Sequence, residues 1–184
     1  MKNITHFEKV SFEQFQKDIL KNTKIKNKIE EMYDNIQLPK RATIGSAGYD
    51  FFLPFDIVLK PQESIIIPTG IRCQMNDEYV LQIYPRSSLG FKFRLQLDNV
   101  VGIIDSDYYY ACNEGHIMIK ISNLSFENKQ VELVRGEAFV QGILLTYGKT
   151  MDDNTYDIRK GGLGSTNKSV SYTHLRAHET LRHL

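Results

Sequence analysis

The chain has 184 residues, of which 41% are hydrophobic and 24% are charged, and its formal net charge is +1. This size and composition predict one globular domain with a substantial core. The near-neutral charge and the lack of a long apolar run give no reason to expect nucleic acid or a membrane as a partner. Without a signal-peptide core or a CxxC pair, and with only Cys73 and Cys112, the chain is expected to be cytoplasmic.

The first 40 residues are rich in lysine and glutamate and carry two helical patterns. Ser11, followed by Gln14 three residues later, resembles a capping box at a helix start. Apolar side chains then recur at helical spacing, first at Phe12, Phe15, Ile19 and Leu20 and again at Ile25, Ile29, Met32, Tyr33 and Ile36. We expect residues 1–40 to form a helical extension packed on the main domain. Binding of a partner protein is the alternative.

Residues 41–147 have a different texture, in which short β-rich runs alternate with Gly, Pro, Asn and Asp. Helical periodicity is absent, and many short strands at regular spacing are typical of an all-β sandwich or barrel. The predicted strands are 49–52, 57–59, 64–68, 70–75, 79–84, 96–101, 116–122, 130–133 and 138–147.

Residues 148–167 are predicted to form a polar, acidic linker followed by a glycine-rich segment. The glycines at 161–166 can form a nest of backbone N–H groups around phosphate, although a flexible linker has the same composition. The spacing is not that of a Walker A loop. Residues 168–184 hold His174, His178 and His183 without an apolar pattern, and we interpret them as a disordered tail of cloning origin rather than a metal site.

The run 102–108 contains a candidate catalytic residue, Asp105. Val101, Ile103 and Ile104 predict a short buried strand, and Asp105 follows directly. A carboxylate at the lip of a buried strand is held rigidly while its oxygens face a cavity, which suits a general base. The alternative is a turn aspartate that closes a hairpin.

Three further stretches combine polar and small residues in ways that suit an anionic ligand. Residues 46–50 place Asp50 beside small residues at a strand start, where a backbone is easily approached, although a simple turn has the same pattern. Residues 85–90 place Arg86 before two serines, which offers a charged fork and neutral donors to one anion, or alternatively a helix cap. Residues 135–141 predict a turn and a strand in which Gln141 needs a hydrogen-bond partner, from a ligand or from the core.

Each signal is weak alone, but their order and spacing resemble the five motifs of the trimeric dUTP diphosphatase (dUTPase) family. The motifs lie at residues 47–50, 85–90, 99–108, 135–141 and 161–166, and the resemblance covers residues 38–167. It implies a distorted β-barrel of jelly-roll type that assembles as a homotrimer, with each active site built from three chains. It also implies hydrolysis of dUTP to dUMP and pyrophosphate, which keeps dUTP low and supplies dUMP for dTMP synthesis, with Mg²⁺ bound mainly through the substrate triphosphate.

The resemblance also implies a role for each motif residue. Asp105 is the catalytic base that activates the water, and Asp50 has a supporting, water-linked role near the metal rather than a direct ligand bond. Tyr108 packs under the deoxyribose and leaves no room for a 2′-hydroxyl. The remaining implied contacts are uracil recognition by Asn99, Gly102 and Ile104, phosphate contacts from Arg86, Ser87, Ser88 and Gln141, and a lid carrying Arg159, Leu163, Gly164, Ser165 and Thr166.

The sequence departs from the family pattern at three places. Leu163 stands where the family usually has an aromatic residue over the uracil, so lid stacking is weakened. Arg159 lies two residues before the double glycine, where many members have it three before. The stretch 109–115 is longer than the usual turn, and we expect a loop near the sugar or at a subunit contact.

Two alternative functions remain open from the sequence. The dCTP deaminase branch of the same fold uses a glutamate on the strand after motif three, where this chain has Lys120. A non-catalytic module that binds dUTP or a partner protein belongs to a different class, and the N-terminal extension could serve it. Asp105 and Tyr108 both stand at their motif positions, which favours the hydrolase.

Overall fold

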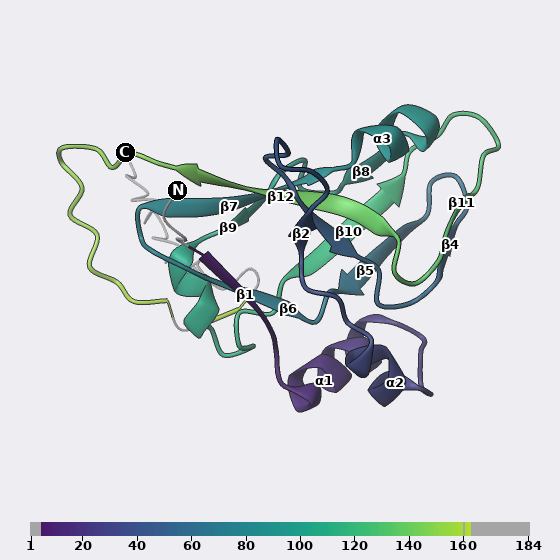
Figure 1. Cartoon of the computed structure of the whole chain (residues 1–184), viewed down its shortest axis with the longest axis horizontal. Helices are drawn as coiled ribbons and strands as arrows, with labels where there is room; N and C mark the ends of the chain where they lie inside the picture. The colour runs from purple at the N-terminus through teal and green to yellow at the C-terminus, as the bar shows by residue number, and fades with distance from the viewer. Residues whose placement is uncertain (1–4, 160, 163–184) are drawn as a thin grey trace, which may run out of the picture.

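The largest sheet of the computed structural model has five strands in the order β2-β3-β12-β7-β9, and the structure describes residues 5–159 and 161–162 (Figure 1). All neighbouring strands in it are antiparallel. Because β12 is the longest strand and pairs with both β3 and β7, it holds the middle of this sheet. The strand bounds are β2 Lys40–Arg41, β3 Tyr49–Phe52, β7 Tyr79–Pro85, β9 Gly102–Ile104 and β12 Ala138–Thr146.

Three smaller sheets complete the β structure. A three-stranded sheet runs in the order β5-β10-β8, and two pairs join β1 to β6 and β11 to β4. The strand bounds are β1 Thr5–Lys9, β4 Ile57–Leu59, β5 Ser64–Pro68, β6 Ile71–Met75, β8 Leu95–Leu97, β10 Met118–Asn123 and β11 Val131–Leu133.

The core lies between these sheets and is filled by alternating side chains of the strands. Leu81 and Ile83 of β7 and Phe139 of β12 are at most 2% exposed, and Phe51 of β3 is 1% exposed. Gly142 of β12 has no side chain because a Cβ there would lie 2.9 Å from Leu81 and from Phe51. This close contact fixes the central strand against its neighbours.

The N-terminal residues add a strand and two helices, α1 Phe12–Asn22 and α2 Ile29–Asp34, at one end of the sheets (Figure 1). Ser11 caps α1, as predicted, because its hydroxyl accepts a hydrogen bond from the Gln14 backbone N–H. Phe15 and Ile19 of α1 are completely buried and belong to the same hydrophobic cluster as the strands. No helix within residues 5–159 and 161–162 is long and apolar enough to cross a membrane.

The predicted strand 96–101 is wrong. β8 ends at Leu97, a turn follows in which Val100 has a φ of 64°, and β9 begins at Gly102. β9 is also not the buried strand that its apolar residues predict, because it pairs only with β7 at the sheet edge and leaves Ile103 51% exposed. Gly102 alone is buried there, against Ile83.

Two short helices lie next to the predicted motifs. Helix α3, Ser87–Phe93, follows β7 and confirms a helix start after Pro85, but its N-cap residue is Arg86 and no serine side chain caps it. A 3₁₀ helix, η1, spans Ser106–Tyr110 directly after β9. Both helices begin within one residue of a charged motif residue, so strand ends position the candidate site.

Candidate active site

One group of motif residues, which we call the phosphate cluster, gathers where β3, β7 and β12 meet. The register of β12 sets Gln141 opposite Asp50 on one side and Tyr84 on the other. Arg86 lies 3.5 Å from the Asp50 carboxylate, and its guanidinium donates to the carbonyl of Ala138 in β12. Motifs one, two and four therefore meet in one chain.

Gly48 lets the phosphate cluster close. A Cβ at this position would lie 2.5 Å from Oε1 of Gln141, so the amide occupies the space that any side chain would need. The other end of the amide donates to the carbonyl of Pro85 at 3.3 Å. Gln141 thus has a hydrogen-bond partner within the protein, and its predicted phosphate contact would use the second hydrogen of its amide NH2 group.

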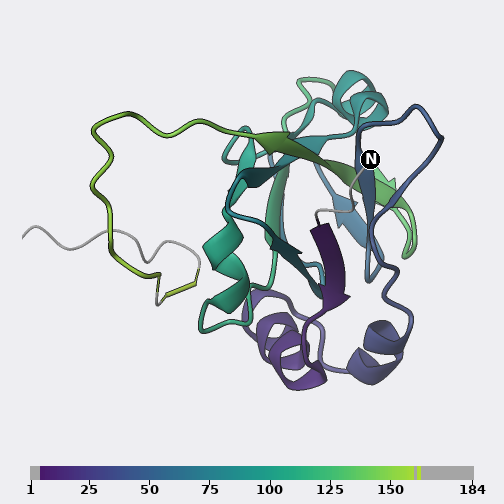
Figure 2. The same ribbon diagram turned by 60° about the vertical axis from the view of Figure 1, so that its left-hand side comes forward.

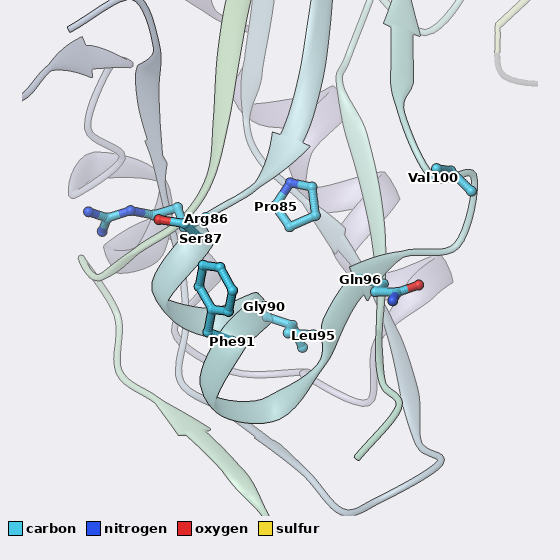
Figure 3. Close-up of a pocket in the computed structure, with 8 residues that line it drawn as sticks. All are labelled: Pro85, Arg86, Ser87, Gly90, Phe91, Leu95, Gln96 and Val100. Carbon is cyan, nitrogen blue, oxygen red and sulfur yellow. The ribbon is translucent and has the colours of Figure 1, made fainter. Parts of the chain in front are cut away.

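A pocket of about 470 Å³ lies beside the phosphate cluster, under α3. Figure 3 shows the Arg86 guanidinium extending away from Phe91. The Asp50 carboxylate lies 3.5 Å from this guanidinium. Ser87 and Ser88 are both exposed at the start of α3. The lining residues are Pro85, Arg86, Ser87, Gly90, Phe91, Leu95, Gln96 and Val100.

A second group, the carboxylate cluster, forms where β9 ends. Asp105 is the N-cap residue of η1, yet its side chain makes no capping bond, unlike an ordinary turn aspartate. Instead its Oδ2 accepts a 2.6 Å hydrogen bond from the Arg159 guanidinium, which also donates to Asp107 at 2.8 Å. The segment after β12 turns away from the sheet and returns beside η1 to bring Arg159 there (Figure 2).

Tyr108 lies beneath this ion pair. The Arg159 guanidinium carbon is 5.7 Å from the centre of the Tyr108 ring, and the tyrosine is 6% exposed. Its hydroxyl donates to the carbonyl of His116 and accepts from Asn113, each at 2.9 Å. Burial raises the pKa of Tyr108 above its usual value, against the lowering effect of the Asn113 hydrogen bond. The ring is therefore neutral and fixed at both its face and its hydroxyl.

Asp105 also borders a cavity of about 550 Å³. Side chains of β7, β9, η1 and the segment after β12 line this cavity, and several of them are acidic. The lining residues are Asp77, Val80, Gln82, Ile103, Asp105, Ser106, Asp107, Tyr147, Lys149, Asp153 and Thr155.

The two clusters lie at opposite ends of β7. Leu81 pairs with Ile104 and Ile83 pairs with Gly102, so Asp105 continues toward Val80 while Arg86 lies at the other end of the strand. A strand rises about 3.3 Å per residue, which separates Asp105 from Arg86 by about 20 Å. The pockets beside the two clusters share no lining residue. The two clusters therefore do not meet within one chain.

The remaining predicted site residues divide between these places. Asn99 is exposed in the turn before β9, and Gly102 and Ile104 lie in β9 itself. Gly162, the last described residue, lies close to the Asn113 side chain, since a Cβ on it would be 3.0 Å from that side chain. The predicted lid residues and the predicted tail lie outside the described residues, namely Leu163, Gly164, Ser165, Thr166 and 168–184.

Sequence reasoning missed three residues of the carboxylate cluster. Asp107 binds Arg159, and Asn113 and His116 hold the Tyr108 hydroxyl. The Asp-Ser-Asp spacing gives a signal for Asp107, because two acids that flank one residue can share an arginine. No sequence pattern points to His116, which is completely buried and 8 residues away from Tyr108.

Known proteins resemble the chain over most of its length. The dUTPase family model matches residues 34–168. The deoxyuridine 5'-triphosphate nucleotidohydrolase of Lactococcus lactis is 40% identical over 134 residues, which cover 71% of this chain and 88% of that protein. The crystal structure of the dUTPase from Streptococcus mutans has 32% identity and a TM-score of 0.58, and the match covers 78% of this chain and 97% of that chain.

A more distant structure shares the fold alone. A mutant dUTPase from phage phi11 of S. aureus, whose structure describes the coordination of a structural Mg(II) ion, is 19% identical with a TM-score of 0.59. The match covers 84% of this chain and 98% of that chain. These matches confirm the predicted all-β jelly-roll barrel. With the family model matched over most of the chain, the protein belongs to the dUTPase family.

Proposed function

We propose that the protein hydrolyses dUTP to dUMP and pyrophosphate. The observation that carries this proposal is Asp105, an exposed carboxylate that directly follows the edge strand β9, lies beside a cavity and makes no capping bond. Its side chain is 51% exposed, so a water molecule can reach it. Family membership adds the substrate and the reaction.

In the proposed reaction, Asp105 accepts a proton from a water molecule whose oxygen attacks the α-phosphorus. The bond from the α-phosphorus to the oxygen that bridges to the β-phosphorus breaks, and pyrophosphate leaves with that oxygen. General-base help of this kind contributes roughly 10²–10⁴-fold. Arg159 exchanges its carboxylate partners for phosphate oxygens, which frees Asp105 for the water.

The phosphate cluster binds the triphosphate in this proposal. Ser87, Ser88 and Gln141 donate to phosphate oxygens, and Arg86 remains anchored by Asp50 while it adds positive charge. In the carboxylate cluster, Tyr108 packs against the deoxyribose. The uracil edge is recognised by Asn99, Gly102 and Ile104. The site then excludes a 2′-hydroxyl because the ring is held in place by its own hydrogen bonds.

The donor set fits a Mg²⁺ ion carried by the substrate. Within residues 5–159 and 161–162, no group of three or more His, Cys, Asp or Glu side chains is placed to hold a metal. Mg²⁺ commonly keeps several waters and binds one or two carboxylates plus substrate phosphates. Asp50, with its side chain 17% exposed beside Arg86, is suited to hold such a water. When bound, the ion neutralises charge that develops on the phosphate oxygens.

We also propose that three copies of the chain assemble and share their active sites. The separation of about 20 Å between Asp105 and Arg86 along β7 supports this, because one triphosphate nucleotide needs both groups at close range. A cyclic assembly brings the carboxylate cluster of one copy to the phosphate cluster of the next.

A substrate panel tests the proposed function. With Mg²⁺, we expect pyrophosphate from dUTP and at least about 100-fold less from dCTP, dTTP and UTP, because fixed polar groups and the buried tyrosine reject the analogues. Chelation of Mg²⁺ should slow the reaction. Pyrophosphate and nucleoside products are measured together by chromatography.

The same panel separates the alternatives. Deoxyuridine nucleotides formed from dCTP would establish a deaminase, although the candidate position for its acid holds Lys120, which is paired with Asp98 at 2.6 Å. Binding of dUTP without pyrophosphate release would establish the non-catalytic module.

A further inference from the structure

The segment 109–116, which follows Tyr108, is held by the N-terminal helix. Ser11 at the start of α1 donates two hydrogen bonds to Glu114, from its backbone N–H at 2.7 Å and from its hydroxyl at 2.6 Å. Farther along α1, Asp18 lies 2.6 Å from Nδ1 of His116. The α1 region thus holds the segment at two of its residues, Glu114 and His116.

The hydrogen-bond partners of His116 indicate its tautomer. The Gly70 backbone N–H can only donate, and it lies 2.8 Å from Nε2, so this nitrogen accepts. Nδ1 therefore carries the proton and donates to Oδ2 of Asp18, which also accepts from Gln14 at 2.7 Å. His116 is completely buried, so its ring has one orientation as long as Asp18 accepts from it.

The backbone carbonyl of the same histidine holds Tyr108, the residue that is proposed to contact the deoxyribose. The carbonyl of His116 accepts from the Tyr108 hydroxyl, and Asn113 donates to that hydroxyl from within the same segment. A third contact joins the segment to the N-terminal strand, since the Tyr109 hydroxyl donates to Glu8 at 3.2 Å. The chain of contacts from α1 to the Tyr108 ring is continuous and buried at its centre.

We propose that Asp18 and Glu114 are positioning residues, which fix the Tyr108 ring through the segment 109–116 and so set the discrimination between deoxyribose and ribose. This inference rests on the proposed function. The N-terminal helix and the long segment after Tyr108 are joined by hydrogen bonds, in which each supplies polar partners to the other.

The test compares kcat/KM for dUTP and for UTP in variants of the full chain. Asp18→Ala should lower the ratio of kcat/KM for dUTP to kcat/KM for UTP at least tenfold. The reason is that His116 loses its hydrogen-bond acceptor, and the Tyr108 ring then loses its fixed position. Asp18→Asn should keep the ratio within twofold, because an amide oxygen can replace Oδ2 for both of its donors. Ile19→Ala is the matched control, since it removes a buried side chain of the same helix and leaves these hydrogen bonds in place.

A ratio that falls equally in Asp18→Ala and Ile19→Ala would overturn the inference, because general loosening of the helix would then explain both. Glu114→Ala serves as the second variant if Asp18→Ala does not fold, and an unchanged ratio in Glu114→Ala would likewise overturn it. The double variant with Tyr108→Phe adds a check. The effect of Asp18→Ala should largely vanish in that background, and independent effects would contradict the proposal.

The wild-type protein separates this inference from the proposed function. If it releases no pyrophosphate from dUTP, the proposed function fails. If it hydrolyses dUTP and the Asp18→Ala variant keeps the wild-type ratio, only the positioning role fails.

Discussion

Asp105→Asn is expected to lower kcat for dUTP by roughly 10²–10⁴-fold, since the amide cannot take the proton of the attacking water. The substitution keeps the size and the placement of the side chain at the end of β9. Binding of a non-hydrolysable dUTP analogue should remain within a few-fold of wild type. Single-turnover kinetics and calorimetric titration measure the two quantities separately.

Asp107→Asn is the matched control for this prediction. Asp105 and Asp107 both bind Arg159, and each side chain is 51% exposed, so either substitution weakens the same anchor of the segment after β12. Only Asp105 is expected to carry the proton. Equal losses of kcat in the two variants would mean that the anchor matters and that Asp105 is not the base.

Phe15→Ala is expected to lower the free energy of unfolding by about 3–5 kcal/mol, the usual cost of a large cavity in a core. Phe15 lies in α1, is completely buried and has its ring centre 5.8 Å from that of Tyr33 and 6.2 Å from that of His116. The N-terminal helix therefore contributes to the same core as the strands. Urea unfolding, followed by fluorescence and by circular dichroism, measures the change.

Leu20→Ala provides the comparison on the same helix. Leu20 is 40% exposed, so its truncation should cost about 1 kcal/mol or less. If Phe15→Ala unfolds α1 alone, the two probes will give different transitions. Such a separate transition would contradict the view that the extension folds together with the barrel.

Local patterns predicted much of the fold. Ser11 caps α1 as its spacing with Gln14 indicates, and the strands 49–52, 57–59 and 64–68 match the structure because turn residues bound them on both sides. Short apolar runs between turn residues were sufficient evidence for these strands.

The same reasoning failed where long-range pairing decides the outcome. The stretch 96–101 has the composition of a strand, yet Val100 adopts a left-handed conformation and splits it. Ile103 is apolar but exposed, because β9 is an edge strand in the single chain. Burial depends on the neighbours of a strand, and these are not encoded in its own residues.

The family resemblance predicted a set of motifs in a site built from three chains, but it did not predict the contacts that each motif residue makes. The motif order identified Asp50, Arg86 and Gln141, which the structure brings together, and Asp105, which it places at the far end of β7. The hydrogen bond between Asp18 and His116 joins residues 98 positions apart. No local pattern could predict this bond.

The central claim is that Asp105 of one copy acts with the phosphate cluster of another, and subunit mixing tests it most directly. One tagged variant carries Asp105→Asn, and a second carries Ser87→Ala with Gln141→Ala. Each is expected to be nearly inactive as a pure protein. The two are then co-expressed in equal amounts, and mixed assemblies are isolated through both tags.

Sharing of sites predicts that the isolated mixed trimers regain about a third of the wild-type rate, because a ring that holds both variants has one site of its three in which both halves are intact. Sites that lie within a single chain predict no recovery, because every chain then carries a defect in its own site. A mixture as inactive as the separate variants, with mixed assemblies demonstrated by mass, would contradict the account.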